Sequence, residues 1–486
     1  MQVIQRTEER ILTADVFERE AGGTPRNGQG TVTEAAREVP VYHETDVLVV
    51  GGGPSGSAAA AAAADAGAQV VLLERYNHLG GLATGGLVIW IDRMSDWEGR
   101  LVIRGFAEEV LGRLPPDAIA GPPVPEWGSQ DAVRAQHWSF RTAAWHGIVT
   151  WSPTIDPERL KLASQEALVE RGVRLVYHSW ACVPLMAEGD PGRVAGAIFE
   201  SKEGRMAIRA KVVVDATGDG DLFARAGAAF HSDIEPHDAH HCMNTAWLFG
   251  GVDMERWITF RRQNPEAFSD FMARGRAACG LFEKPYVSWR DDIALFMGPR
   301  QSGYSGLDVD DLSAVEIRSH RAMAAHLDFY RAHAPGFEQA WMMLSAPQIG
   351  VRHTRRLVGT DAVLRSRWSE GTALPDEVAV TPAVSPKFPN ISIPYGALVP
   401  VQLDGLLACG RHVSCDRNSH GFMREIPQCW LTGQAAGAAA ALAVRQGVQP
   451  RAVDIAALQA ELLRQGAYLR SAGAGAPQDT PTAAIA

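Results

Sequence analysis

The stretch VVGGGPSGSAAAAAAADAGAQVVLLER, residues 49–75, decides the fold of this 486-residue chain. A β-branched run meets glycines, an alanine-rich helix follows, and a second strand ends in an acidic residue, which predicts a βαβ unit. Gly51, Gly53 and Gly56 have the spacing that permits a tight turn, close approach of a pyrophosphate and close helix–strand contact. The free N–H groups at the start of the helix would face the phosphates. The stretch therefore predicts a dinucleotide site.

Two later segments indicate which dinucleotide. VVVDATGDGDLFARAG (residues 212–227) supplies another strand that ends in small residues and glycines, and LDGLLACGRHVS (residues 403–414) leads into a glycine- and alanine-rich helix. Glu74, at the end of the second strand, is placed to accept hydrogen bonds from a ribose diol. A helix whose N-terminus faces the pyrimidine carbonyl of a flavin would stabilise the reduced ring. The three motifs in this order favour FAD over NAD.

Composition and spacing predict an α/β fold: a Rossmann-like FAD-binding domain in three pieces, with an inserted α+β substrate or cap domain. The expected pieces are residues 41–89, 156–228 and 401–470, and the inserted domain spans residues 229–400. Residues 1–40 form an N-terminal extension, residues 90–155 a tryptophan-rich cap insert and residues 471–486 a disordered tail. The extension is either disordered or packs as an arm on a partner, which leaves a homo-oligomer open.

Charge and hydropathy exclude several classes of protein. The net charge of −10, with no segregated basic face, argues against nucleic acid as a partner. No apolar run is long enough to span a bilayer, and the N-terminus lacks the apolar core of a secretory signal. The six cysteines are scattered without a C-x-x-C pair, which is typical of buried thiols in a reducing compartment. We expect a cytoplasmic protein without a membrane segment and without a metal site.

The motifs GGGPxG, LGGxAT and DATGDGDLxARAG resemble those of FAD-dependent oxidoreductases with the two-dinucleotide-binding-domain, glutathione reductase-like fold. The resemblance runs from about Val32 to Leu469 and is specific for the family but not for a substrate. It implies bound FAD, with the pyrophosphate on the first glycine loop and the flavin near the Gly80–Gly81 pair. The cofactor-binding residues implied are Gly51, Gly53, Pro54, Ser55, Gly56, Glu74, Arg75, Gly80, Gly81, Ala83, Thr84, Ala181, Ala216, Gly218, Asp219, Gly410, Arg411 and Gln434.

One segment departs from the disulfide reductases of this fold. Where those enzymes keep two redox cysteines, this chain has Ala83, Thr84 and Gly85, so a thiolate relay has no sulfur. No second G-x-G-x-x-G motif for a nicotinamide appears between residues 228 and 400. We predict an FAD-dependent oxidoreductase that transfers a hydride between a small organic substrate and the flavin. The alternatives are a flavin-dependent monooxygenase or halogenase, and a non-enzymatic flavin-binding subunit.

The candidate catalytic residues lie in two clusters. His412, His420 and Arg424 belong to the loop that enters the last glycine-rich helix, where a histidine could carry a proton and an arginine could anchor a carboxylate. Arg352 belongs to VRHTRRLVG, for which strand alternation predicts Arg352 and Arg356 on one face. The arginines of this cluster either bind an anionic group of the substrate or form structural ion pairs.

The tryptophans of the insert and His78 each have a structural and a functional interpretation. The tryptophans of the insert are more typical of packing than of an aromatic substrate pocket. His78, before the glycine pair, invites a covalent flavin link, although a supporting role is favoured.

Overall fold

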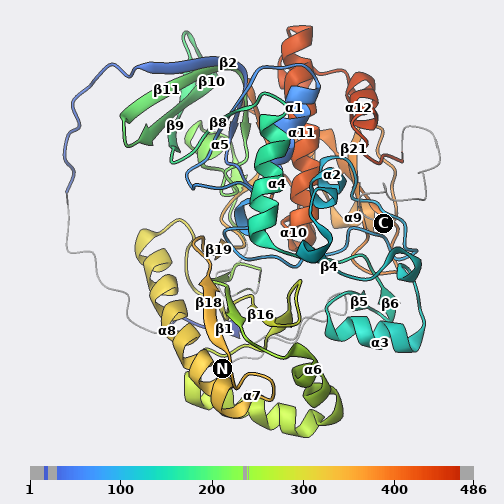
Figure 1. Ribbon diagram of the computed structural model, residues 1–486. Helices are drawn as coiled ribbons and strands as arrows, with labels where there is room; N and C mark the ends of the chain where they lie inside the picture. The colour runs from blue at the N-terminus through green and yellow to red at the C-terminus, as the bar shows by residue number, and fades with distance from the viewer. Residues whose placement is uncertain (1–15, 20–29, 234–237, 239, 471–486) are drawn as a thin grey trace.

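The computed structural model describes residues 16–19, 30–233, 238 and 240–470, which form two lobes (Figure 1). The upper lobe contains a seven-stranded sheet, and the lower lobe, between residues 241 and 351, is built on two smaller sheets and three helices. The expected α/β class is confirmed. The predicted tail lies outside the described residues, as does most of the predicted N-terminal extension.

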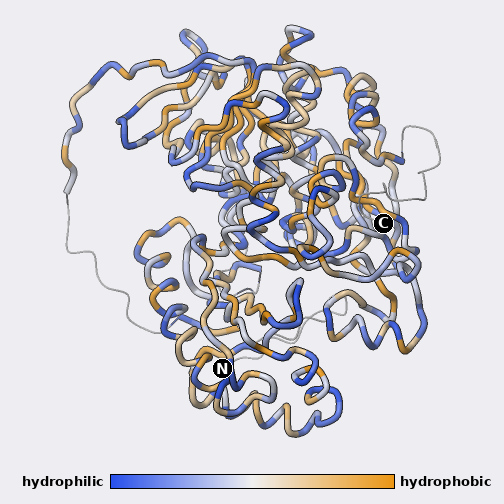
Figure 2. The backbone as a smooth tube through the Cα atoms, in the orientation of Figure 1, coloured by the Kyte–Doolittle hydropathy of each residue, from blue (hydrophilic) through white to orange (hydrophobic). Residues whose placement is uncertain are grey.

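The large sheet combines a parallel and an antiparallel part. Its strands are β2 (Val41–Val50), β3 (Val70–Leu73), β8 (Arg174–Val176), β9 (Trp180–Ala187), β10 (Asp190–Ser201), β11 (Gly204–Asp215) and β23 (Leu406–Ala408). Strands β8, β3, β2, β11 and β23 are parallel neighbours in that order, and the β9–β10 ribbon pairs antiparallel with the first half of β11. β3, β23 and the last four residues of β2 are continuous, buried apolar runs (Figure 2), because both faces of the sheet are covered there.

The upper lobe also contains helices. They are α1 (Pro54–Asp65), α2 (Phe106–Gly112), α4 (Pro157–Val169), α5 (Asp221–Arg225), α9 (Arg365–Trp368), α10 (Arg417–Met423), α11 (Ile426–Gln446) and α12 (Ile455–Arg464). Helices α1 and α11 pack backbone to backbone. A Cβ on Gly433 would lie 2.1 Å from the carbonyl oxygen of Ser55, and one on Gly437 2.0 Å from that of Ala59. Since both partners advance by four residues, the two helices run parallel, and their N-termini point to the same edge of the sheet.

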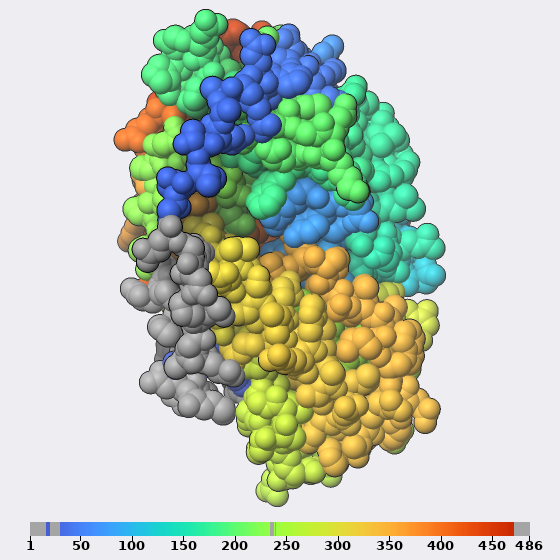
Figure 3. All heavy atoms as spheres, turned by 90° about the vertical axis from the view of Figure 1, so that its left-hand side faces the viewer, coloured from blue at the N-terminus to red at the C-terminus, as the bar shows by residue number. Residues whose placement is uncertain are grey.

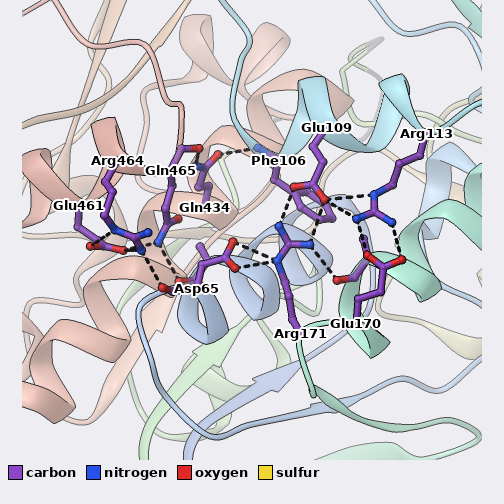
Figure 4. A network of polar contacts seen from close by, with 12 residues as sticks. Asp65, Phe106, Glu109, Arg113, Glu170, Arg171, Gln434, Glu461, Arg464 and Gln465 are labelled. Carbon is purple, nitrogen blue, oxygen red and sulfur yellow. Dashed lines mark hydrogen bonds and ion pairs between the residues drawn. The ribbon is translucent and has the colours of Figure 1, made fainter. Parts of the chain in front are cut away.

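A network of ion pairs joins the outer ends of these helices (Figure 4). Arg171, just after α4, contacts Asp65 at the end of α1 at 2.9 Å and Glu109 of α2 at 2.7 Å. Arg113 joins Glu109 and Glu170 at 2.9 and 2.7 Å. Each of these half-exposed ion pairs contributes little to stability alone. Because they share partners, together they hold α2 against α1 and α4.

The tryptophan-rich segment contains α3 (Ala132–Phe140) and the short strands β4 (Ile119–Ala120), β5 (Ala144–Trp145), β6 (Ile148–Val149) and β7 (Thr154–Ile155). Its indoles pack against loops, and those of Trp90, Trp97 and Trp127 donate to carbonyl oxygens. Trp97 donates to Ala383 at 2.9 Å, and Trp127 stacks on Trp151 with ring centroids 5.1 Å apart. These contacts have the character of packing.

The lower lobe contains α6 (Met254–Gln263), α7 (Pro265–Cys279), α8 (Val309–His333) and two four-stranded sheets. The first sheet is β15 (Tyr286–Val287), β16 (Ile293–Phe296), β14 (Trp247–Gly250) and β18 (Trp341–Ser345); the second is β1 (Val16–Phe17), β17 (Arg300–Gln301), β13 (Met243–Asn244) and β19 (Gly350–Val351). Aromatic side chains from α6, α7, α8 and the first sheet form its core, centred on Trp257 and Tyr330.

Two further strand pairs complete the described chain: β12 (Phe230–His231) with β20 (Arg356–Leu357), and β21 (Glu377–Thr381) with β22 (Ile391–Pro394). In the view of Figure 3, the extended segment after residue 30 lies on the surface of the upper lobe, above the yellow and orange lower lobe. None of the helices in the described part of the chain combines the length and the apolarity needed to cross a lipid bilayer.

Candidate functional site

The site is a cleft at the carboxyl ends of β2, β3 and β11, where α1 and α11 begin. It encloses about 810 Å³ of empty space, part of it open to solvent. Its lining is Val50, Gly51, Gly53, Pro54, Ser55, Leu73, Glu74, Arg75, Tyr76, Gly81, Leu82, Ser179, Trp180, Ala181, Ala216, Thr217, Gly218, Asp221, Gln348, Arg411, Arg424, Ile426 and Cys429. Ligands of open α/β sheets bind at this edge.

The three glycines of the first loop have different surroundings. A Cβ on Gly51 would lie 2.5 Å from the carbonyl oxygen of Ala216, and Gly51 has a φ of +99°. A Cβ on Gly56 would lie 1.7 Å from the carbonyl oxygen of Gly51. Around Gly53, in contrast, the nearest atom is the Cα of Gly81 at 3.9 Å. Gly51 and Gly56 are thus required by the protein's own packing, whereas Gly53 leaves room in the cleft for a ligand to touch the backbone.

Glu74 ties the end of β3 to the glycine loop. Its carboxylate accepts hydrogen bonds from the N–H groups of Gly52 at 2.6 Å and Tyr76 at 2.8 Å. Burial raises the pKa of Glu74, and these two N–H groups oppose the shift only in part. One edge of the carboxylate still lines the cleft, where it can accept hydrogen bonds from hydroxyl groups.

Arg411 lies across the opposite wall. Its guanidinium packs on Gly218, where a Cβ would come within 2.4 Å of Nη1, and its Nη2 donates to Asp219 at 2.6 Å. Asp219 also accepts from the Thr354 hydroxyl at 2.9 Å. Burial alone would raise the pKa of Asp219, but Arg411 and this hydroxyl outweigh it and the net shift is downward. The ion pair fixes a cation beside the glycine loop.

The offset between α1 and α11 gives the cleft two positive regions. Gly433 is level with Ser55, so Pro54 is level with Thr432, six residues after the first residue of α11. At 1.5 Å per residue, α11 therefore begins about 9 Å before the level at which α1 begins. Each helix start presents free N–H groups and the positive end of its dipole. One elongated ligand with two negatively charged or electron-rich parts can therefore contact both helix N-termini.

The end of the cleft at α11 is built from distant segments. Gln348, which precedes β19, meets Arg424, Ile426 and Cys429 here. The Gln348 Oε1 is buried and accepts no hydrogen bond from the described residues. Burial raises the pKa of the Cys429 thiol to about 12, so the sulfur is protonated at neutral pH. This end offers an arginine, an amide and a helix start.

Several of the predicted cofactor residues stand behind this lining. They are Gly56, Gly80, Ala83, Thr84, Asp219, Gly410 and Gln434. Thr84 Oγ1 donates to the Leu79 carbonyl at 2.6 Å, which shapes the glycine turn. Gln434 accepts from the Phe106 N–H at 3.1 Å and donates to the Gln465 carbonyl at 3.2 Å, so its amide links α11 to α2 and α12. These residues support the cleft from behind.

The predicted catalytic residues are spread over different environments. Only Arg424 lines the cleft. His412 is fully buried, with Nε2 3.1 Å from the Asp215 carbonyl oxygen, and it packs on Phe223. His420 is fully buried, and among the described residues neither of its ring nitrogens has a hydrogen-bond partner. It faces His353 with ring centroids 4.9 Å apart.

Burial, and next the neighbouring His353, hold the pKa of His420 well below its ordinary value of 6.5. The imidazole is therefore neutral at physiological pH. The N–H of Arg424 donates to the His420 carbonyl at 3.3 Å, so the two are joined through one turn of α10. This position suits a residue that supports Arg424 better than one that exchanges protons with a ligand.

The alternation predicted for VRHTRRLVG is wrong, because only residues 350–351 and 356–357 are strand and the segment between them is irregular. Arg356 is buried and donates to the Cys415 carbonyl at 2.7 Å. Arg355 donates to the Asp219 carbonyl at 2.9 Å. Arg352 is half-buried and, in the described structure, lies on the lower-lobe side, where its charge acts on Glu283.

Sequence reasoning missed part of the lining: Val50, Leu73, Tyr76, Leu82, Ser179, Trp180, Thr217, Asp221, Gln348, Ile426 and Cys429. Most of these neighbour a predicted residue, so their position next to a motif was an available signal. Gln348 is the exception. It reaches the cleft through the fold of the lower lobe, and no local pattern marks it.

The cleft fits a flavin dinucleotide. Its open Gly53, the cation of Arg411 and the start of α1 suit a pyrophosphate. The carboxylate of Glu74 suits a ribose diol, and the unpartnered Gln348 amide oxygen suits a ring N–H. Within the described residues, no group of three or more ligating side chains is placed to hold a metal ion.

Comparison with known proteins identifies one family. The sequence model described as FAD dependent oxidoreductase matches residues 46–462. The sequence has no significant match among the curated proteins.

Among solved structures, a geranylgeranyl bacteriochlorophyll reductase-like protein from Thermoplasma acidophilum is 15% identical, covers 86% of this chain and 82% of its own, and has a TM-score of 0.43. The p-nitrophenol 4-monooxygenase PnpA from Pseudomonas putida is 12% identical, with 87% and 84% coverage and a TM-score of 0.42. The flavin-dependent brominase Bmp2 is 16% identical, with 87% and 83% coverage and a TM-score of 0.43. Likeness of this degree does not bear on the reaction.

Proposed function

Since the chain belongs to the FAD dependent oxidoreductase family, we propose that it transfers a hydride between a small organic substrate and FAD, without a redox-active disulfide. That it is an FAD-dependent enzyme confirms the expectation from sequence. The proposal concerns the reaction type, the glutathione reductase-like branch of the fold, and the lower lobe as the substrate-side cap.

The proposed placement of FAD follows the chemistry of the lining. The adenosine end lies by Glu74, Arg75, Ser179 and Ala181, and the pyrophosphate lies by Gly53. The isoalloxazine ring lies at the other end, where α11 starts. When bound, FAD supplies a ring system that accepts or gives two electrons. The rest of the chemistry belongs to the side chains around it.

The observation that carries the proposal is the composition of the cleft at the start of α11. In the described chain, Cys429 is the only cysteine that lines the cleft, and its thiol is held protonated. A protonated thiol is a poor nucleophile, so a thiol–disulfide relay is disfavoured. Arg424 and the first turn of α11 instead provide fixed positive potential. That environment favours negative charge arriving on the ring, as hydride transfer from carbon requires.

Three residues have proposed roles at this end. Arg424 holds a carboxylate or carbonyl oxygen by its guanidinium. Gln348 orients the ring through its amide. His420 has a packing role behind the cleft, where its buried, neutral imidazole lies against His353.

The test is anaerobic mixing of the FAD-loaded protein with a panel of small alcohols, amines and carboxylic acids, followed by the visible absorbance of the flavin. We expect one class of compound to bleach the flavin without oxygen and without a nicotinamide. The Cys429→Ala variant is the matched control and should bleach at the parent's rate. Bleaching only by a nicotinamide, with a product that gains oxygen from air, would replace this proposal by a monooxygenase.

A further inference from the structure

A second pocket lies in the lower lobe between α7, the segment before β15 and β17. It encloses about 960 Å³ of empty space, including its open mouth. Its described lining is Phe268, Ser269, Met272, Arg276, Phe282, Glu283, Lys284, Tyr286, Pro299 and Arg300. None of these residues lines the FAD cleft. We call it the lower-lobe pocket.

Arg300 is the unusual member of this lining. Its side chain is almost entirely buried, at 3% exposure, and none of the residues that the structure describes forms a hydrogen bond with Nη1. No described acidic side chain forms an ion pair with it. A guanidinium stays charged at every physiological pH, and a buried charge without a counter-ion costs several kcal/mol. A pocket that retains such a buried charge is suited to bind an anionic ligand.

Glu283 is the nearest candidate counter-ion, but it does not serve as one. It is 7% exposed, and its Oε2 has no hydrogen-bond partner in the described part of the chain. Burial raises the pKa of Glu283 to about 8, and the charges of Arg300, Arg352 and Lys284 offset burial only in part. The carboxyl is therefore largely protonated at neutral pH. It leaves the Arg300 charge uncompensated and becomes a donor to a second oxygen.

Lys284 adds a cation to the same pocket. Burial, and next the charge of Arg261, lower the pKa of Lys284 to about 8, so a large part of the population is still protonated at neutral pH. Lys284 also lies over the ring of Tyr286, with Nζ 5.6 Å from the ring centroid. The pocket thus holds three basic side chains, Arg276, Lys284 and Arg300, against one neutral acid.

Apolar side chains form another part of the lining, next to Arg276 of α7. Phe268 and Met272 come from one face of α7, four residues apart, and Phe282 faces them in the aromatic core. The cavity itself, about 390 Å³ without its open mouth, is in the range of small-molecule sites. Its walls would bury a flat or branched apolar body while the cations face one end.

We propose that the lower-lobe pocket binds a small carboxylate with an aromatic or branched apolar body. The carboxylate accepts from the guanidinium of Arg300 and from Lys284, and the body packs on Phe268, Met272 and Phe282. A planar carboxylate matches the fork of a guanidinium, and the charge pair cancels the cost of the buried cation. The inference is independent of the proposed hydride transfer, because no residue is shared with the FAD cleft.

The experiment is calorimetric titration of the full-length, FAD-loaded protein with benzoate, with benzamide as the neutral isostere. We expect benzoate to bind and benzamide to bind at least about tenfold more weakly, which is the weight of a charge-assisted hydrogen bond. Arg300→Met should weaken benzoate about tenfold or more. Glu283→Gln should change the affinity for benzoate by less than about threefold, because the native carboxyl is already neutral.

The matched control is Arg274→Gln, on the same helix but outside the pocket and paired with Asp270 at 2.9 Å. It should bind benzoate like the parent. If Arg300→Met does not fold, Lys284→Met provides the same readout with a loss of about fivefold. Equal binding of benzoate and benzamide, or no binding of benzoate at all, would overturn the proposal. Benzoate binding that survives in both cation variants would overturn it as well.

Discussion

The two ends of the FAD cleft are built in different ways. The end at α1 is made mostly of backbone and of residues close together in the sequence: the glycines and helix start at residues 51–56 and Glu74 at the end of β3, joined by Arg411 from later in the chain. The end at α11 is made of side chains from segments that meet only in the folded protein, such as Gln348 and Arg424. The first is required by the dinucleotide and by local packing, whereas the second is free to suit a particular reaction. The α1 end of the cleft therefore identifies the family, whereas the α11 end determines which substrate is bound.

The largest effect that tests this contrast is expected from Gly56→Ala. The new methyl would lie 1.7 Å from the Gly51 carbonyl oxygen, and α1 is fixed by its contact with α11. We expect the free energy of unfolding to fall by about 3 kcal/mol or more. Urea denaturation of the apo-protein measures it. A stable variant would show that the backbone end tolerates side chains and would break the contrast.

Gly53→Ala should separate cofactor binding from stability. The methyl meets no protein atom closer than 3.9 Å, so the apo-protein should unfold like the parent. The same methyl occupies the approach to the backbone, and FAD should bind more weakly by about 2 kcal/mol, roughly thirtyfold. Fluorescence titration with FAD reports the dissociation constant. Parent-like affinity would mean that the phosphates lie elsewhere.

Low pH probes the buried imidazoles behind the α11 end. Burial, and next Arg356 and His241, lower the pKa of His353 from 6.5 to about 3. Below pH 6.5 the unfolded chain binds a proton that the folded imidazole refuses, so stability is complete above that value and is lost as the pH falls toward 3. The loss at a pH of about 5 is about 2 kcal/mol. His353→Gln should show a correspondingly smaller difference between urea midpoints at neutral and acid pH, and an identical difference would contradict the assignment.

Arg424→Met should change the electronics of the α11 end without emptying the cleft. Loss of one cation near the ring should lower the flavin midpoint potential by about 20–30 mV, equivalent to about 1 kcal/mol. Arg417→Met is the control, because Arg417 pairs with Asp238 at 2.6 Å outside the cleft lining. Anaerobic dye-coupled titration measures both. Equal potentials in the two variants would remove Arg424 from the site.

The smallest effect is expected from Cys429→Ala. The thiol lines the cleft but is held protonated, so it should contribute packing rather than chemistry. We expect FAD affinity to change by less than about 0.5 kcal/mol, and iodoacetamide to leave the parent's flavin reduction rate unaltered. Rapid inactivation by the reagent would mean that a thiol takes part after all.

The same contrast explains what the sequence could predict. The glycine spacing, Glu74 and the strand at residues 212–215 follow from local patterns, because a βαβ turn and its ligand are made within a few dozen residues. The β9–β10 ribbon and the position of β23 at the edge of the sheet follow from tertiary pairing. His412 and Gln434 share the motifs of the cleft but face its supporting side, which no spacing rule distinguishes.

Gln348 and the lower-lobe pocket lay beyond prediction for a related reason. Gln348 enters the cleft because β19 pairs with β13 in a sheet that also includes β17, which carries Arg300. The strand alternation expected around Arg352 failed because the strands there are only two residues long. Short strands in mixed sheets take their register from tertiary contacts rather than from their own sequence.

The most direct test of the account is the visible spectrum of the purified protein before and after acid precipitation. His78 is not among the residues that line the cleft, and its ring packs against the backbone of Gly85. We therefore predict a yellow protein that releases FAD into the supernatant, as expected for a cofactor held by the cleft without a covalent bond. A colourless protein that takes up no added FAD would contradict the assignment of the cleft, and colour that stays in the pellet would contradict non-covalent binding.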